Sequence, residues 1–184
     1  GADKAIRLTD SKFEGSDGFA IAKILCRVVK DLPFNLILTG AQAGDDGYAV
    51  VGAILAALLG IPHATMVKKI ELSGEAAKLN RELEGGIEEI VEVTLPAVLA
   101  IQTGINEPRY VSIMGTRKAM QKEVKVIGLA ELGLSENEVG EAGSWIRIEK
   151  MYTPPVEKQA EFLKGSPDEI ASKIAEILRA KGLV

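Results

Sequence analysis

The order of apolar and polar positions in the first part of the chain predicts a strand followed by a helix. Residues 5–8 (AIRL) indicate a short strand. Apolar residues then recur at the spacing of an amphipathic helix, which we expect to be capped by Ser16 or Asp17 and to end near Asp31. The apolar stripe of this helix consists of Ile21, Ile24, Leu25 and Val28.

A second strand and a second helix are predicted next. The run FNLILTG (34–40) has the length of a strand, is predominantly apolar and ends in a glycine, which is typical of a buried strand. The helix after it should span about residues 47–59. Because this helix is apolar on every side, we expect it to be packed between layers.

The middle of the chain is rich in strand patterns. Residues 62–72 and the segment up to Leu83 indicate strands, and residues 84–86 (EGG) form a turn into IEEIVEVTL (87–95). The strand AVLAIQTG (97–104) follows. This alternation predicts an α/β fold with a mostly parallel sheet and flanking helices, to which a late β-hairpin is added.

The later segments are shorter. A helix should begin at about Val111, after a proline that prevents an earlier start. Two short strand-like pieces follow, residues 124–133 and 144–152.

The C-terminal part differs in character from the rest. An irregular arm with paired prolines (TPPVEKQAEFLKGS) leads to a helix whose start carries a capping box and whose end is marked by Gly182. The residues of the box are Ser166, Pro167 and Glu169. We therefore expect an α/β domain over residues 1–150, and an arm and helix over residues 151–184 that pack on this domain or on a partner subunit.

Composition and charge narrow the classes of partner. Hydrophobic residues make up 47% and charged residues 26% of the chain, as in folded proteins. A net charge of −4 without a block of basic residues argues against nucleic-acid binding. The single cysteine, Cys26, excludes a disulfide framework and indicates a reducing compartment. The longest apolar stretch is too short for a bilayer, so membrane insertion is not expected.

The loop from Gly40 to Gly47 has the geometry of an anion site, because it follows a strand and opens a helix. It lacks the lysine and hydroxyl of a Walker loop and the spacing of a dinucleotide fingerprint. Its two aspartates, Asp45 and Asp46, have two interpretations. Either one caps the helix, or Asp46 binds a ribose hydroxyl while backbone amides after it hold a phosphate.

No catalytic constellation is visible in the sequence. His63 is the only histidine, and the serines best placed to act as nucleophiles, Ser112 and Ser144, have no evident partner. A metal site built from His63 and scattered carboxylates has no characteristic spacing.

Three landmarks together resemble a known family. The loop QAGDDG, the turn ELEGG, and the segment LPAVLAIQTGINEPRY (95–110) occur in the order and separation found in the β subunit of electron-transfer flavoprotein. The block NEPRY (106–110) is the most specific of the three. The likeness extends over essentially the whole chain.

The resemblance implies an electron carrier without covalent chemistry of its own. Family members pair with an α subunit that holds most of the redox FAD, and they shuttle electrons from dehydrogenases to an acceptor, in the cytoplasm or the mitochondrial matrix. The β subunit holds AMP, or a second FAD in bifurcating members, in a Rossmann-like fold related to adenine-nucleotide hydrolases.

The resemblance also assigns site residues. The nucleotide-binding residues implied are Gln42, Ala43, Asp46, Gly47, Ala49, Val50 and Val51. An exposed apolar anchor after NEPRY would dock onto dehydrogenases, and the residues implied are Tyr110, Ile113, Met114 and Lys118. The alternative for Ile113 is that it packs in the core.

Two departures from the family pattern weaken the expected nucleotide site. Ala49, Val50 and Val51 replace polar residues where the helix opens, and the family has a βαβ stretch before the segment that begins this chain. We therefore expect weak AMP binding or none by this chain alone, and exposed apolar surface that seeks a partner or a second copy of the chain.

Two other functions stay open at this point. A nucleotide-binding module of the universal-stress type would share the fold, but the late glycine pattern of that class is missing. An interaction protein that has lost its nucleotide site would bind the α-type partner without AMP, in keeping with residues 49–51.

Overall fold

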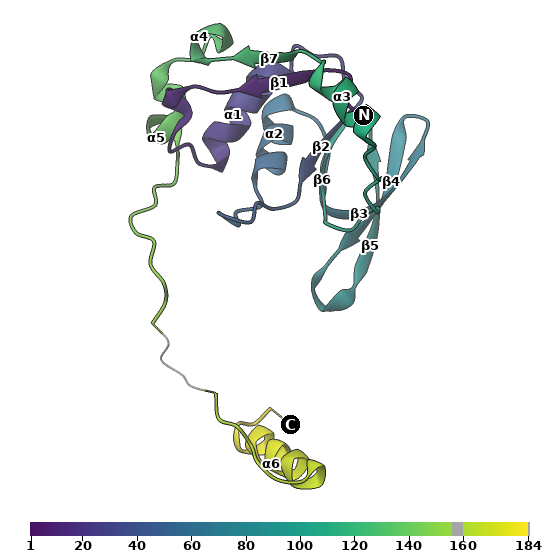
Figure 1. The fold of residues 1–184 in the computed structure, drawn as a ribbon, viewed down its shortest axis with the longest axis vertical. Coiled ribbons are helices and arrows are strands. Elements are labelled where there is room, and N and C mark those ends of the chain that lie inside the picture. Colours follow the sequence, from purple (N-terminus) through teal and green to yellow (C-terminus); the bar gives the residue numbers. More distant parts are fainter. Residues whose placement is uncertain (156–159, 184) are drawn as a thin grey trace. The chain divides into compact units, whose positions relative to one another are not determined.

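The computed structural model describes residues 1–155 and 160–183, which divide into two compact units, Gly1–Arg147 and Ile148–Val184. Figure 1 shows their elements. The strands of the first unit are β1 (Ala5–Leu8), β2 (Leu36–Gly40), β3 (His63–Ser73), β4 (Ala76–Glu82), β5 (Glu88–Thr94), β6 (Ala97–Ile101) and β7 (Val124–Ile127). Its α-helices are α1 (Gly18–Val29), α2 (Val51–Leu59), α3 (Ile113–Met120), α4 (Leu129–Leu132) and α5 (Gly140–Gly143). Its 3-10 turns are η1 (Ser11–Phe13), η2 (Glu84–Gly86) and η3 (Glu136–Glu138).

The strands form two sheets. The larger has the order β2-β6-β3-β4-β5, with parallel pairing of β2, β6 and β3 and antiparallel pairing from β3 to β5. The smaller pairs β1 and β7 in parallel. Helices α1 and α2 pack against each other, and α2 lies against β6 (Figure 1). The α/β fold class is confirmed.

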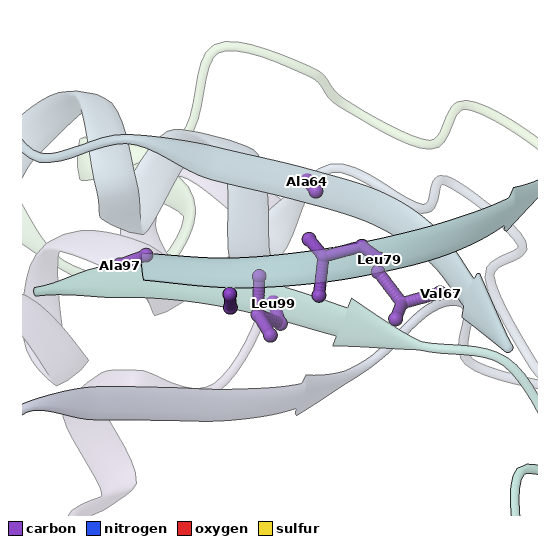
Figure 2. Close-up of a cluster of buried hydrophobic side chains, with 6 residues drawn as sticks. Ala64, Val67, Leu79, Ala97 and Leu99 are labelled. Atoms are coloured by element: carbon purple, nitrogen blue, oxygen red, sulfur yellow. The ribbon is translucent and has the colours of Figure 1, made fainter. Parts of the chain in front are cut away.

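Two buried clusters hold the first unit together. One lies between strands of the larger sheet, with side chains that meet across β3, β4 and β6 (Figure 2). Its members are Ala64, Val67, Ala77, Leu79, Ala97 and Leu99. The second joins α1 to β7 and the short helices after it, and its members are Ile24, Ile127, Leu129, Leu132 and Val139. Both clusters consist of aliphatic side chains, whose removal from water drives folding.

The start of α1 agrees with its sequence signals. Asp17 is the N-cap, and its Oδ1 accepts a hydrogen bond from the backbone N–H of Ala20 at 2.9 Å. Of the predicted stripe, Ile24 is buried, whereas Ile21 stays partly exposed.

Helix α2 begins later than predicted. Its first residue is Val51, because Ala49 has a positive φ of 55° and therefore cannot belong to a right-handed helix. Nor is α2 covered on all sides, since Leu58 remains 41% exposed in the described structure.

The predicted strand-like piece at residues 144–152 is wrong. Residues 124–127 pair with β1, and no strand forms within residues 144–152. The physical reason is that the N–H groups of Trp145 and Ile146 donate to the Asp17 carboxylate, at 2.8 and 3.0 Å, and so are not available to a strand ladder. The antiparallel hairpins of the fold lie in the middle of the chain, from β3 to β5.

Outward-facing side chains alternate along β5, the last strand of the larger sheet. Glu88, Ile90 and Glu92 are exposed, whereas the residues between them are half-buried. Ile90 is 62% exposed.

The second unit contains α6 (Pro167–Ala180), which has the predicted capping box. Ser166 Oγ accepts from the N–H of Glu169, and the Glu169 carboxylate accepts from the N–H of Ser166. The middle of the predicted arm, residues 156–159, lies outside the described residues. None of the described helices is both long and apolar enough to span a membrane.

Candidate functional site

Two neighbouring parallel strands end together and so bring two loops side by side. Gly40 of β2 is paired with Ile101 of β6, and the N–H of Ala41 donates to the Ile101 carbonyl at 2.9 Å. The carboxyl end of parallel strands is the usual place for a ligand in open α/β sheets.

A cavity of about 500 Å³ lies between these loops, and we call it the loop cavity. Its lining residues are Gly40, Ala41, Gln42, Ala43, Gly44, Gly47, Ile101, Gln102 and Thr103. The volume is within the range of small-molecule sites. All of the lining side chains are uncharged, so backbone groups and two carboxamides supply most of the polarity of the cavity.

Gln42 closes the loop after β2, which forms one wall of the loop cavity. Its Nε2 donates to the carbonyl of Gly47 at 2.7 Å and so joins the two ends of the loop. Gly47 has a φ of 68°, and a Cβ at this position would lie 3.3 Å from that Nε2. Glycine is therefore favoured at the point where the chain turns toward α2.

The two aspartates of the loop do not cap α2, so the capping interpretation is wrong. Asp46 Oδ1 accepts from the N–H of Tyr48 at 3.0 Å, and Asp45 Oδ1 accepts from the N–H of Asp46 at 3.0 Å. The N-cap of α2 is Val50, which offers no side-chain acceptor. The left-handed Ala49 separates the aspartates from the first turn of the helix. Their carboxylates therefore fold the loop onto itself.

The residues implied for nucleotide binding divide into three groups. Gln42, Ala43 and Gly47 line the loop cavity. Val50 lines a different, apolar groove, and the remaining residues, Asp46, Ala49 and Val51, line neither. The structure adds Gln102 and Thr103, which the sequence interpretation did not single out. The signal for them was the polar pair that directly follows the strand AVLAI.

The apolar groove lies on the other side of the same loop and has a volume of about 410 Å³. Tyr48 and Val50 line it, together with Phe19 and Trp145, whose rings stack with centroids 4.1 Å apart. Asp17 is also part of its wall.

Asp17 holds the chain segment that carries Trp145. Partial burial opposes ionisation of Asp17, but the N–H groups of Ala20, Trp145 and Ile146 together outweigh it and lower the pKa of this carboxyl. Ser144 Oγ accepts from the Asp17 N–H at 2.8 Å and donates to the Gly140 carbonyl at 2.7 Å. The first unit is thus tied to its own last residues by hydrogen bonds between positions far apart in sequence.

The residues implied for docking are exposed. Tyr110 is 92%, Ile113 is 72% and Met114 is 64% exposed, and Lys118 is exposed on the same helix. Helix α3 is capped by Ser112, whose Oγ accepts from the N–H of Gly115 at 3.1 Å, and α3 has no buried residue. The alternative that Ile113 packs in the core is therefore wrong.

No metal centre is visible in the described part of the chain, where no three His, Cys, Asp or Glu side chains are grouped to hold an ion. His63, the only histidine, is exposed at the start of β3.

Comparison with known proteins agrees with the fold and the landmarks. The family model described as the electron transfer flavoprotein domain matches residues 1–132. The chain is 40% identical to the electron transfer flavoprotein subunit beta of Methylophilus methylotrophus, over 97% of this chain and 68% of that protein. It is 36% identical to the corresponding subunit of Thermoanaerobacterium thermosaccharolyticum, over 100% of this chain and 71% of that protein.

A further relative is a component of a larger assembly. The caffeyl-CoA reductase-Etf complex subunit CarD of Acetobacterium woodii is 31% identical over 100% of this chain and 71% of that protein. The family model and the relatives cover the strands, the loop cavity and the exposed segment before α3 alike. The chain therefore belongs to the electron transfer flavoprotein family, as a β subunit.

Proposed function

We propose that the chain, paired with an FAD-carrying α subunit, carries electrons from dehydrogenases to an electron acceptor and makes no covalent bond to its substrates. The observation that carries this proposal is the exposed apolar row Tyr110, Ile113 and Met114, which has the character of a protein-docking surface. An electron shuttle has to diffuse between partners, so we place it in the cytoplasm, or in the mitochondrial matrix of a eukaryote.

Docking would depend on the way α3 presents its first turn. The Ser112 cap fixes the start of the helix, so Ile113 and Met114 protrude at a defined place. Lys118 lies about one helical turn further on, where a cation can attract a carboxylate of the dehydrogenase. FAD, when bound on the partner subunit, accepts and releases the electrons. The role of this surface is to orient the dehydrogenase.

We place the nucleotide of this subunit, AMP or a second FAD, at the loop cavity and the start of α2. The backbone N–H groups at the beginning of α2 have no side-chain cap, and the helix dipole favours an anion there. The side chains at the start of α2, residues 49–51, are all apolar and offer no hydrogen bond to a ligand. This favours the second candidate, a subunit that binds its partner without any nucleotide.

We propose that the arm and α6 of this chain contact the α subunit. Ile174 and Ile177 on α6 are 45% and 42% exposed, and the arm exposes Met151, Tyr152 and Phe162. An apolar stripe on a helix and large apolar side chains on an irregular segment need a partner surface. We propose that this surface belongs to the α subunit, and self-association of the chain is the alternative outcome.

Replacement of Ile113 by alanine tests the docking surface. The chain is co-expressed with an electron-transfer flavoprotein α subunit, and reduction of the flavin by a dehydrogenase is followed by absorbance. We expect kcat/KM to fall about tenfold, since loss of an interface anchor costs more than about 1 kcal/mol.

Ile90→Ala is the matched control, because Ile90 is a similarly exposed isoleucine on β5. It should leave the rate unchanged, and both variants should keep the same flavin content. Equal rates for the wild type and Ile113→Ala would contradict the docking role. Failure of the chain to form a complex with any α subunit would contradict the carrier function itself.

A further inference from the structure

The two walls of the loop cavity each carry one carboxamide. Gln42 comes from the loop after β2 and is occupied in closing that loop, through its bond to the Gly47 carbonyl. Gln102 comes from the segment after β6 and forms the opposite wall together with Thr103.

The backbone of Gln102 is fixed by the sheet. Its N–H donates to the carbonyl of Val67 on β3 at 2.9 Å, and the residue before it, Ile101, accepts from Ala41 on the other side. Gln102 directly follows the central strand β6, and the bond to Val67 holds its backbone to the sheet. A side chain on such a rigid element is held more accurately than one on a loop.

The carboxamide of Gln102 is also held in one orientation. Its Nε2 donates to Glu82 Oε2 at 3.2 Å, and its Oε1 accepts from the N–H of Thr103 at 3.0 Å. Glu82 in turn lies 3.9 Å from the Lys68 ammonium, which offsets its negative charge. A primary amide has two N–H donors and two acceptor lone pairs, so these two bonds together leave one donor and one acceptor on Gln102 for a ligand.

The uncharged lining decides which part of a nucleotide fits here. No lysine or arginine is among the residues that line the loop cavity, so a phosphate would lose its water there without a counter-charge. Ribose hydroxyls and base edges are neutral and both donate and accept hydrogen bonds, which matches a carboxamide. The start of α2, with its N–H groups and dipole, is the better place for a phosphate.

We propose that Gln102 binds the nucleoside part of the nucleotide, with its remaining donor and acceptor, and that Glu82 positions it. This inference rests on the nucleotide binding proposed above. Under this proposal, Gln102 is a binding residue that contacts the sugar or the base and does not contact the phosphate.

Titrations with AMP and with adenosine test the inference, with the chain in complex with an α subunit. Gln102→Ala should weaken both ligands by the same factor, about tenfold, because both hydrogen bonds to the nucleoside are lost. The matched control is Asn80→Ala. Asn80 is another carboxamide that donates to a glutamate, Glu88, at 3.0 Å, but it does not line the loop cavity. Its loss should leave both affinities unchanged.

The outcomes separate the two proposals. If Gln102→Ala weakens AMP and leaves adenosine unaffected, or if it changes neither, the role of Gln102 is refuted while nucleotide binding stands. If the wild-type complex binds neither AMP, adenosine nor added FAD, the nucleotide site itself is refuted. Gln102→Asn keeps the amide and serves if the alanine variant fails to fold, and it should weaken both ligands because its shorter side chain cannot reach Glu82 as well.

Discussion

At the scale of single residues, the Asp17 carboxylate accepts several structural hydrogen bonds at once. One carboxylate caps α1 and also accepts the N–H groups of Trp145 and Ile146, so that a side chain near the start of the chain holds a segment near the end of the first unit. An ionised carboxylate accepts stronger hydrogen bonds than a neutral one. The contact between the start of α1 and the segment Trp145–Ile146 therefore depends on the charge of Asp17.

Acid should loosen the segment around Trp145 that Asp17 holds. The pKa of Asp17 is lowered below its usual value of 3.8, so the charged form is stabilised by folding. That contribution to the free energy of unfolding is complete above about pH 4 and is lost as the pH falls through the folded-state pKa. The fluorescence of Trp145, the only tryptophan, should report the loss of its stack on Phe19.

Asp17→Asn should reproduce the acid effect at neutral pH. The amide nitrogen would face backbone donors, and we expect a loss of about 1–2 kcal/mol in urea unfolding. Asp31→Asn is the control, since the Asp31 carboxylate forms an exposed ion pair with Arg27, and its loss should change stability by less than about 0.5 kcal/mol. An unaltered Trp145 spectrum in Asp17→Asn would show that the carboxylate does not hold this segment.

At the scale of elements, the contact between β2 and α2 depends on one glycine. A Cβ on Gly52 would lie 2.5 Å from Thr39 Oγ1 and 3.5 Å from the Cβ of Ala100. Thr39 Oγ1 is buried and has no hydrogen-bond partner in the described structure. The close approach of helix and strand therefore leaves no space for a methyl group at Gly52.

Substitution at this contact should show strong coupling. Gly52→Ala is expected to destabilise the chain by about 1–3 kcal/mol through overpacking, despite the better helix propensity of alanine. Thr39→Ala should cost little and should relieve most of that loss in the double variant. Denaturant unfolding of the four proteins gives the interaction energy, and strictly additive effects would mean that the two residues do not meet.

The elements that the sequence predicted well are those with local signals. Asp17 and Ser166 mark the starts of α1 and α6 because a cap acts within three residues of itself. The start of α2 was misplaced because nothing local to Ala49 shows its left-handed conformation. The strand-like piece at residues 144–152 was predicted wrongly because the acceptor for Trp145 and Ile146 lies far away in sequence.

The site was predictable to a similar extent. Gln42 and Gly47 could be found because they lie in a glycine-rich loop between a strand and a helix. Gln102 could not be found in this way, because its place in the cavity depends on β6 being the neighbour of β2. The local sequence of a strand does not identify a pairing partner that is far away in the chain.

At the scale of the whole molecule, the first unit has what it needs to fold. Both of its buried clusters are made of residues between Ile24 and Val139. A chain that ends after Arg147 should therefore keep the thermal unfolding midpoint of the full chain. It should also lose the complex with the α subunit, as measured by size-exclusion chromatography, because the arm and α6 are missing.

Two results would contradict this division of labour. A large drop in the unfolding midpoint would show that the second unit contributes to the core of the first. An unchanged complex would show that the α subunit is bound by the first unit alone.

The exposed glutamates of β5 have a consequence for the chain at high concentration. β5 is the edge strand of the larger sheet, so its outer backbone groups are unpaired, and Ile90 on it is an exposed apolar side chain. The same strand of another copy could pair with this edge, and repeated pairing would give a fibre. Glu88 and Glu92 flank that isoleucine, so any such stacking in register would bring carboxylates against carboxylates. We expect the repulsion between these carboxylates to oppose strand-to-strand polymerisation of the protein.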